Sequence, residues 1–278
     1  MPRLSLGDAD IHFWEEGRGT PVLLLHGFPT THLLWRDVAA ALAAAGFRTI
    51  APDLVGFGQS QAAENLEIHV ANQARWMWEL IDGLRLETQP VVVAHDVGTA
   101  VAQLMVVRDP ERIHKLILID GVYADRWAME EVESIRRWDP SRASALSRLL
   151  TRNVRKWTRS TAAAGLLGEM LAEYEGEGGG HRLIRVAQSF DPQQTARILE
   201  QLQRQHPPSL ILWGEDDVFL SVAEVARPLA DLLSADLKVL PGGHFLPIEC
   251  PAVVAAEIEG FARGPTRFPN PRDEKRIR

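Results

Sequence analysis

A carboxylate lies at the apex of a predicted strand-to-helix turn. Residues 91–93 are a β-branched run, Ala94 and Gly98 flank the turn, and Asp96 stands between them. Small flanking residues let a strand and a helix approach closely around a strained apex residue. An apex carboxylate can attack an alkyl carbon and form a covalent ester, so Asp96 is a candidate nucleophile. The alternative is an ordinary turn in which Asp96 caps the helix that begins near Thr99.

A histidine and a cluster of acids follow two later strands. His244 comes after the strand at 237–240, on a loop that contains Gly242 and Gly243. A second apolar run, at 210–213, leads into three acids, which are Glu215, Asp216 and Asp217. An imidazole can take a proton from water, and a carboxylate can orient its ring. His244 is therefore the candidate base, and one of the three acids is its partner.

Apolar runs and helical patterns alternate along the chain. After a hairpin within 4–14, strands are expected at 22–26, 48–53, 91–94, 116–120, 210–213 and 237–240, with helices at 38–45, 69–80 and 99–108. This alternation predicts an α/β fold with a mostly parallel, doubly wound sheet. Ligand sites of such sheets lie at the carboxyl ends of the strands, where Asp96, the acids and His244 are all expected.

The alternation stops after Asp120 for about ninety residues, until the pair Pro207-Pro208 introduces the next strand. Helical segments are expected there, interrupted at Asp139-Pro140, at 176–180 and at Asp191-Pro192, since glycine and proline break helices. The expected organisation is a core of 1–121 and 207–263, an inserted helical lid at 122–206, and a mobile tail at 264–278.

Several segments together resemble the α/β-hydrolase superfamily along nearly the whole chain. They are the Asp96 turn, the loop His26-Gly27-Phe28-Pro29 and the run 51–60, and they are most similar to the epoxide hydrolase and haloalkane dehalogenase branch. The order of nucleophile, acid and histidine is also the order of that superfamily. The resemblance implies a hydrolase that forms an alkyl ester on Asp96, with the insertion covering the active site.

The resemblance also implies roles for individual residues. Backbone N–H groups of Phe28 and Val97 are expected to form the oxyanion hole. In the family pattern Trp-Gly-Glu-x-Asp the acid is the last residue, which is Asp217 here. His26 is expected to brace the oxyanion loop, and His95 to support the turn.

The substrate class is less clearly specified. Epoxide hydrolases of this branch carry two lid tyrosines, and this chain has Tyr123 and Tyr174, neither in a matching position. Epoxide hydrolysis is the first expectation, with Tyr123, Trp138 and Tyr174 as candidate substrate-binding residues. Dehalogenation of haloalkanes or haloacids is the alternative, in which an indole of Trp127, Trp138 or Trp157 would bind the halide. A further alternative is a non-hydrolytic or ligand-binding protein of the same fold.

The dehalogenases of the branch differ from this chain at two positions. Haloalkane dehalogenases usually carry tryptophan after the nucleophile and often asparagine in the oxyanion loop, where this chain has Val97 and Phe28. Fluoroacetate dehalogenases carry arginine at the first of these positions. The sequence therefore leaves open which side chain assists the leaving group.

Composition narrows the classes of partner. The 278 residues are 46% hydrophobic and carry a formal net charge of −7, which argues against non-specific binding to nucleic acid. The N-terminal residues lack an apolar signal core, and the chain has no stretch near the ~20 apolar residues of a membrane span, so a cytoplasmic protein is expected. We expect a small-molecule substrate and no cofactor. The sequence leaves open whether the protein forms a homodimer. A metal site of His26, His95, His244 and Asp96 is not expected, because the spacing matches no known ligand pattern.

Overall fold

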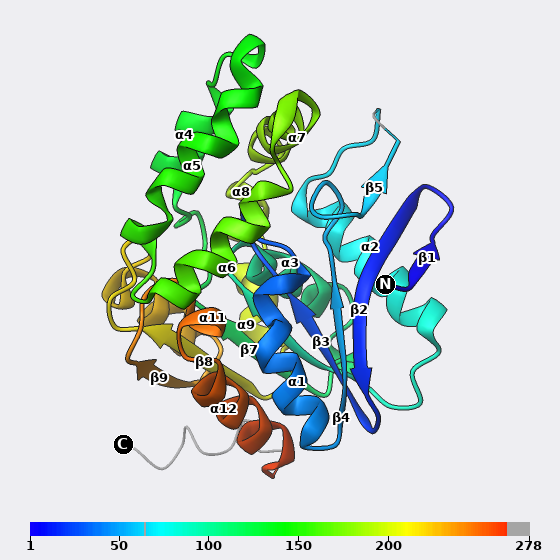
Figure 1. Ribbon diagram of the computed structural model, residues 1–278. Coiled ribbons are helices and arrows are strands. Elements are labelled where there is room, and N and C mark those ends of the chain that lie inside the picture. Colours follow the sequence, from blue (N-terminus) through cyan, green and yellow to red (C-terminus); the bar gives the residue numbers. More distant parts are fainter. Residues whose placement is uncertain (64, 266–278) are drawn as a thin grey trace.

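The computed structural model describes residues 1–63 and 65–265. Within these ranges nine strands form one sheet in the order β1-β2-β4-β3-β6-β7-β8-β9, and β5 pairs with β2 (Figure 1). Neighbouring strands from β4 to β9 run parallel, whereas β2 is antiparallel to β1, β4 and β5. The bounds are β1 (Arg3–Ser5), β2 (Ala9–Gly17), β3 (Thr20–Leu25), β4 (Phe47–Pro52), β5 (Gln61–Ala62), β6 (Val91–His95), β7 (Lys115–Ile119), β8 (Ser209–Gly214) and β9 (Asp236–Leu240).

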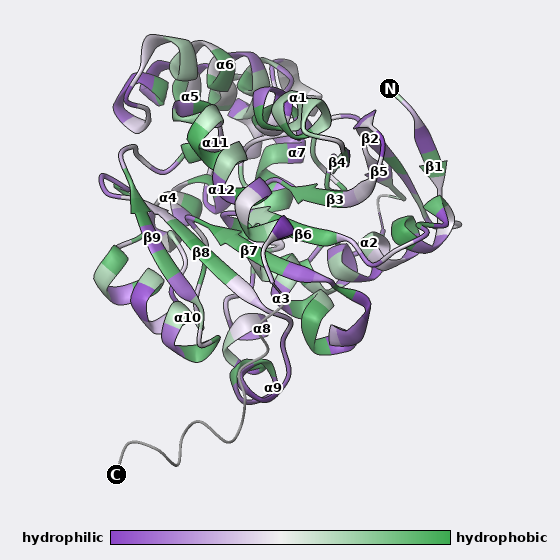
Figure 2. Cartoon of the chain, turned by 90° about the horizontal axis from the view of Figure 1, so that it is seen from below, coloured by the Kyte–Doolittle hydropathy of each residue, from purple (hydrophilic) through white to green (hydrophobic). Residues whose placement is uncertain are grey.

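Helices connect the parallel strands and cover both faces of the sheet, which confirms the predicted α/β fold with a mostly parallel, doubly wound sheet. Helix α1 packs against α12, and α2 packs against α3. In Figure 2 the outer helices, α10 for example, alternate between hydrophobic and hydrophilic residues, as expected for helices with one face on the sheet. Their bounds are α1 (Arg36–Ala44), α2 (Val70–Leu84), α3 (Val97–Arg108), α10 (Arg227–Leu232), α11 (Leu246–Glu249) and α12 (Pro251–Arg263), with η1 (His32–Trp35), η2 (Pro110–Arg112) and η4 (Val222–Ala226) between them.

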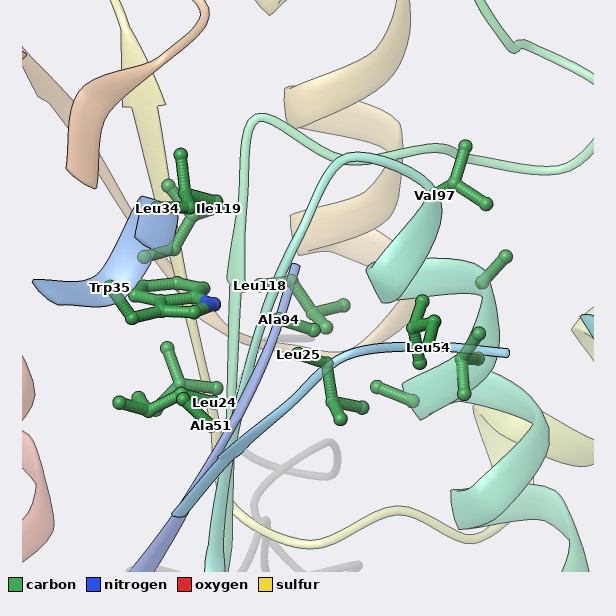
Figure 3. Close-up of a cluster of buried hydrophobic side chains, with 14 of the residues drawn as sticks. Leu24, Leu25, Leu34, Trp35, Ala51, Leu54, Ala94, Val97, Leu118 and Ile119 are labelled. Carbon is green, nitrogen blue, oxygen red and sulfur yellow. The ribbon is translucent and has the colours of Figure 1, made fainter. Parts of the chain in front are cut away.

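The hydrophobic core lies on both faces of the central strands. Every residue of β6, β7 and β8 is buried, as are all residues of β3 after Thr20. Figure 3 shows Trp35 on one side of these strands and Val97, at the start of α3, on the other. A strand that is covered on both faces reads as a continuous apolar run, which explains why the sequence located these strands well.

The segment between β7 and β8 forms a further group of helices (Figure 1). They are α4 (Met129–Arg136), η3 (Pro140–Arg142), α5 (Ala143–Trp157), α6 (Thr161–Ala172), α7 (Gly176–Gln188), α8 (Gln193–Ala196) and α9 (Leu199–Arg204). The predicted interruptions at Asp139-Pro140 and Asp191-Pro192 are confirmed. The predicted interruption at 176–180 is wrong, because these residues begin α7.

Close packing explains two of the glycines at the start of α7. A Cβ atom at position 180 would lie 2.0 Å from the carbonyl oxygen of Ala143, and one at position 179 would lie 2.4 Å from the Tyr174 backbone. Glycine thus lets α7 approach the beginning of α5, rather than ending the helix.

Two expectations concern the C-terminal tail and membrane-spanning segments. From residue 266 on, the predicted C-terminal tail lies outside the described residues. Within the described ranges, no helix is long and apolar enough to cross a membrane.

Candidate active site

Asp96 stands at the turn between β6 and α3 with an unusual backbone conformation. Its φ of 51° lies in a region that L residues rarely adopt. Its side chain makes no capping hydrogen bond to α3, so the alternative interpretation as a helix cap is wrong. A Cβ atom at Gly98 would lie 2.4 Å from the His26 carbonyl oxygen. The close approach of the oxyanion loop therefore requires a glycine at position 98, two residues after the apex.

The Asp96 carboxylate points toward the predicted oxyanion loop. Its Oδ1 atom accepts a hydrogen bond of 2.7 Å from the Phe28 N–H. A Cβ atom at Gly27 would lie 2.3 Å from the same oxygen, so glycine is needed there as well. Burial alone would raise the pKa of Asp96, but the hydrogen bond and charge of His244, aided by the Val97 N–H, hold it below its usual value. The lowered pKa favours the ionised form of Asp96.

The structure places Asp217 beside His244. The distance from His244 Nδ1 to Asp217 Oδ2 is 2.9 Å, and the Asp217 side chain is only 1% exposed. The other carboxylate oxygen accepts hydrogen bonds from the N–H groups of Phe219 (2.8 Å) and Leu220 (3.0 Å). Asp216 is half exposed and instead pairs with Arg159. The loop geometry therefore directs Asp217, and not its neighbour, toward the imidazole.

The second nitrogen of His244 faces Asp96. Its Nε2 atom lies 3.5 Å from Asp96 Oδ2, and the histidine is almost fully buried. Burial alone would lower the pKa of His244, but the charge and hydrogen bond of Asp217, together with those of Asp96, hold it well above its ordinary value. The three predicted residues thus form one carboxylate–imidazole–carboxylate arrangement.

Two further histidines support this arrangement, as the sequence predicted. His26 Nε2 accepts a 2.9 Å hydrogen bond from the Leu54 N–H, and its Nδ1 lies 2.9 Å from the Gly27 carbonyl oxygen. His95 Nε2 lies 2.7 Å from the His244 carbonyl oxygen. Burial lowers the pKa of each ring to about 4, so both are neutral supports. No group of three potential metal ligands occurs among the residues that the structure describes.

The sequence interpretation missed a buried acid, Asp120, which interacts electrostatically with Asp217. Asp120 follows β7 with a φ of 43°, and its Oδ1 atom accepts a 2.7 Å hydrogen bond from the Gly214 N–H. Burial, aided by the charge of Asp217, raises its pKa well above the ordinary value. Asp120 therefore holds the end of β8, from which the Asp217 loop departs. A polar residue at the end of an apolar strand was the signal for it.

An apolar cavity of about 190 Å³ opens onto Asp96 and His244. It is bounded by the oxyanion loop, by the insertion and by the two loops that carry Asp217 and His244. Its apolar lining residues include Phe28, Pro29, Val97, Val122, Trp127, Val132, Ile135, Leu149, Leu150, Trp157, Phe219 and Phe245. Apart from Asp96 and His244, its polar lining residues are Ser134 and Asn153, which no sequence motif had indicated.

The three residues expected to bind substrate do not line this cavity. Tyr174 is fully buried elsewhere, and its hydroxyl has no partner among the described atoms. The Trp138 indole N–H donates to the Arg142 carbonyl oxygen, within the insertion itself. Tyr123 forms a backbone bridge with Arg126. Because none of the three lines the cavity that contains Asp96, we do not assign them a substrate-binding role.

Comparison with known proteins places the chain among hydrolases of the alpha/beta hydrolase fold. The model of the family described as alpha/beta hydrolase fold matches residues 20–177. Haloalkane dehalogenase 2 of Mycobacterium tuberculosis is 28% identical over 263 residues, which cover 89% of this chain and 90% of that protein. An epoxide hydrolase of Caballeronia sordidicola is 24% identical, with 94% of this chain and 92% of that protein covered.

Structural similarity extends to an esterase as well. The solved structure of a thermophilic esterase from Thermogutta terrifontis matches with a TM-score of 0.76 at 22% identity. The match covers 95% of this chain and 98% of that structure. At this level of identity the likeness establishes the fold alone.

Proposed function

Because the chain belongs to the alpha/beta hydrolase fold family and is a hydrolase, we propose that it hydrolyses neutral haloalkanes through a covalent ester on Asp96. The main support is that Asp96 and His244 line an apolar cavity, with Asp217 hydrogen-bonded to His244. A serine at the apex would attack an acyl carbon and become acylated, whereas a carboxylate suits attack on an alkyl carbon. The insertion, residues 122–206, acts as a lid that excludes water from this cavity.

In the first step Asp96 Oδ2 attacks the carbon that bears the halogen. A C–O bond forms while the C–X bond breaks, and the halide leaves with the bonding electron pair. The Oδ1 atom stays at the Phe28 N–H and becomes the carbonyl oxygen of the ester. The product is an alkyl ester of Asp96 and a free halide ion.

In the second step His244 acts as the general base. Its Nε2 atom takes a proton from water, and the resulting hydroxide attacks Cγ of Asp96. The negative charge that develops on Oδ1 is stabilised by the N–H groups of Phe28 and Val97. Asp217 stabilises the imidazolium and keeps its ring oriented. Collapse of the intermediate, with return of a proton to the alkoxide, releases an alcohol and restores the Asp96 carboxylate with loss of one proton to solvent.

The cavity favours small, uncharged substrates. Within the described residues no lysine or arginine lines it, so it offers no permanent cation to pair with the carboxylate of a haloacid. An apolar cavity of about 150 Å³ can hold a benzene molecule. A cavity of about 190 Å³ therefore fits a short-chain or single-ring haloalkane.

Hydrogen-bond donors in the cavity favour a halide over an epoxide oxygen. No tyrosine hydroxyl lines it in the described part of the chain, so the phenol expected to protonate an opening epoxide is missing. Trp127 donates its indole N–H to Thr195 Oγ1. No hydrogen bond found among the described residues occupies the indole N–H of Trp157. This group and the amide of Asn153, which already donates to the Leu149 carbonyl oxygen, are the donors that we assign to the leaving halide.

A panel of substrates tests this choice. We expect 1-chlorobutane and 1-bromobutane to release halide and alcohol, while 1,2-epoxybutane gives little diol and chloroacetate gives little halide. Trp157→Phe should slow halide release about 10- to 100-fold, because one stabilising donor is lost. Trp138→Phe is the matched control, since that indole lies outside the cavity. Diol formation without halide release would reverse the assignment in favour of epoxide hydrolysis.

Alkylation should itself prepare His244 for the second step. The Asp96 charge is one of the interactions that raise the pKa of His244, and the ester removes that charge. A lower pKa leaves more of the neutral imidazole that a base requires. The variant Asp96→Asn mimics the uncharged ester, so we expect its His244 to titrate at lower pH than in the wild type. NMR titration of the ring protons measures this, with the surface variant Asp37→Asn as control. An unchanged or higher pKa would contradict the coupling.

A further inference from the structure

Glu249 gathers three backbone N–H groups around the His244 loop. Its Oε2 atom accepts hydrogen bonds from the N–H groups of Gly243 (3.1 Å) and Arg159 (3.0 Å). Its Oε1 atom accepts a hydrogen bond from the Phe245 N–H at 3.2 Å. Gly243 and Phe245 are the immediate neighbours of His244. A single carboxylate therefore holds the peptide backbone on both sides of the base.

The local backbone is built for this contact. The short helix α11 follows Phe245 and returns Glu249 to the loop that precedes it. A Cβ atom at position 243 would lie only 3.0 Å from Glu249 Oε1, so glycine there permits the approach. Charge-assisted hydrogen bonds from backbone amides to a carboxylate are about twice as strong as neutral ones. Glu249 can thus hold the loop more firmly than an amide side chain would.

The third N–H group belongs to the insertion. Arg159 lies between α5 and α6, and its guanidinium pairs with Asp216, next to the acid of the site, at 3.2 Å. Two residues earlier, the Trp157 ring lies 6.0 Å from the Phe219 ring, which is 5.0 Å from the His244 ring. The segment 157–159 therefore contacts both loops that carry the proposed base and its acid.

We propose that Glu249 is a positioning residue for His244, and that its bond to the Arg159 amide makes the alignment of the base depend on the position of the insertion. The inference rests on the proposed function, in which His244 serves only the second step. A displacement of about 1 Å in a reacting group can lower a rate about 10²-fold. With Nε2 at 3.5 Å from Asp96, a shift of the loop would move the base away from the ester and its attacking water.

Kinetic separation of the two steps tests the positioning role. In Glu249→Gln an NH₂ group replaces one acceptor oxygen, so at least one of the three N–H groups loses its partner. We expect ester hydrolysis to slow about 10- to 100-fold while alkylation keeps its rate. Rapid-quench mass spectrometry with 1-bromobutane should then show an alkyl adduct on Asp96 that builds up after a normal first release of bromide. Glu249→Asp keeps the charge with a shorter reach, so it should accumulate adduct as well.

The control variant is Asp216→Asn, which removes the Arg159 ion pair and leaves the three amide contacts intact. It should turn over without adduct. Equal slowing of both steps in Glu249→Gln would indicate a general loss of structure, and unchanged hydrolysis would also overturn the proposal. Full rescue by Glu249→Asp would show that charge, and not position, matters.

Hydrogen exchange gives a test that needs no substrate. In Glu249→Gln the amide protons of Gly243, Phe245 and Arg159 should exchange with solvent faster together, as followed by NMR. They should keep wild-type exchange rates in Asp216→Asn. If the wild type acts on none of the electrophiles, the proposed function fails, yet the exchange rates still decide the role of Glu249. Unchanged exchange at all three amides would refute it.

Discussion

Replacing His244 with glutamine is expected to trap the enzyme as an alkyl ester of Asp96. The first step needs the Asp96 carboxylate and the halide donors, whereas the second also needs a base at 3.5 Å from the carboxylate. Loss of the base should slow hydrolysis by on the order of 10²- to 10⁴-fold, because that is the usual contribution of general base catalysis. Alkylation should continue. After incubation with 1-bromobutane, intact-protein mass spectrometry should show a gain of one butyl group in place of one hydrogen.

Two controls make this result specific. The double variant Asp96→Ala with His244→Gln should gain no mass, because it lacks the carboxylate that is alkylated. Peptide mapping should locate the butyl group of the single variant on the peptide that contains Asp96. Turnover by Asp96→Ala at the wild-type rate, without any adduct in His244→Gln, would exclude the covalent mechanism.

The second large effect is expected at Asp217. The variant Asp217→Asn keeps the shape of the side chain, but it removes the charge that stabilises the imidazolium and offers the ring the wrong hydrogen-bonding partner. A comparable change in serine proteases lowers kcat about 10⁴-fold, and we expect hydrolysis of the ester to fall by a similar order. Asp217 Oδ1 also accepts two backbone hydrogen bonds, so circular dichroism should confirm that the variant is folded.

The matched control for Asp217 is its neighbour. Asp216→Asn changes the same chemical group one residue earlier, where the side chain is half exposed and faces Arg159. Its effect on steady-state turnover should stay within a few-fold. A larger loss in Asp216→Asn than in Asp217→Asn would show that the acid has been assigned one residue too late.

Local patterns determined most of the framework. The apolar runs at 91–93 and 210–213 predicted buried parallel strands, because a strand covered on both faces needs apolar residues at every position. Glycines at 98 and 243 marked turns where two backbones or a carboxylate approach closely. The residue types at 96, 217 and 244, in that order, then indicated the chemistry. These features were readable because each depends on a short stretch of chain.

Tertiary packing decided the parts that short stretches cannot specify. Tyr123, Trp138 and Tyr174 had suitable side chains, but the packing of the insertion helices set which faces meet the cavity, and it brought Trp157 and Asn153 there instead. The pairing of Glu249 with the Arg159 amide joins residues 90 positions apart, and that of Asp120 with Gly214 joins residues 94 positions apart. No local periodicity encodes such contacts, because they form only when separate elements have packed against one another. The sequence therefore identified the candidate reactive groups, whereas the fold alone determined which neighbours hold them and which side chains line the cavity.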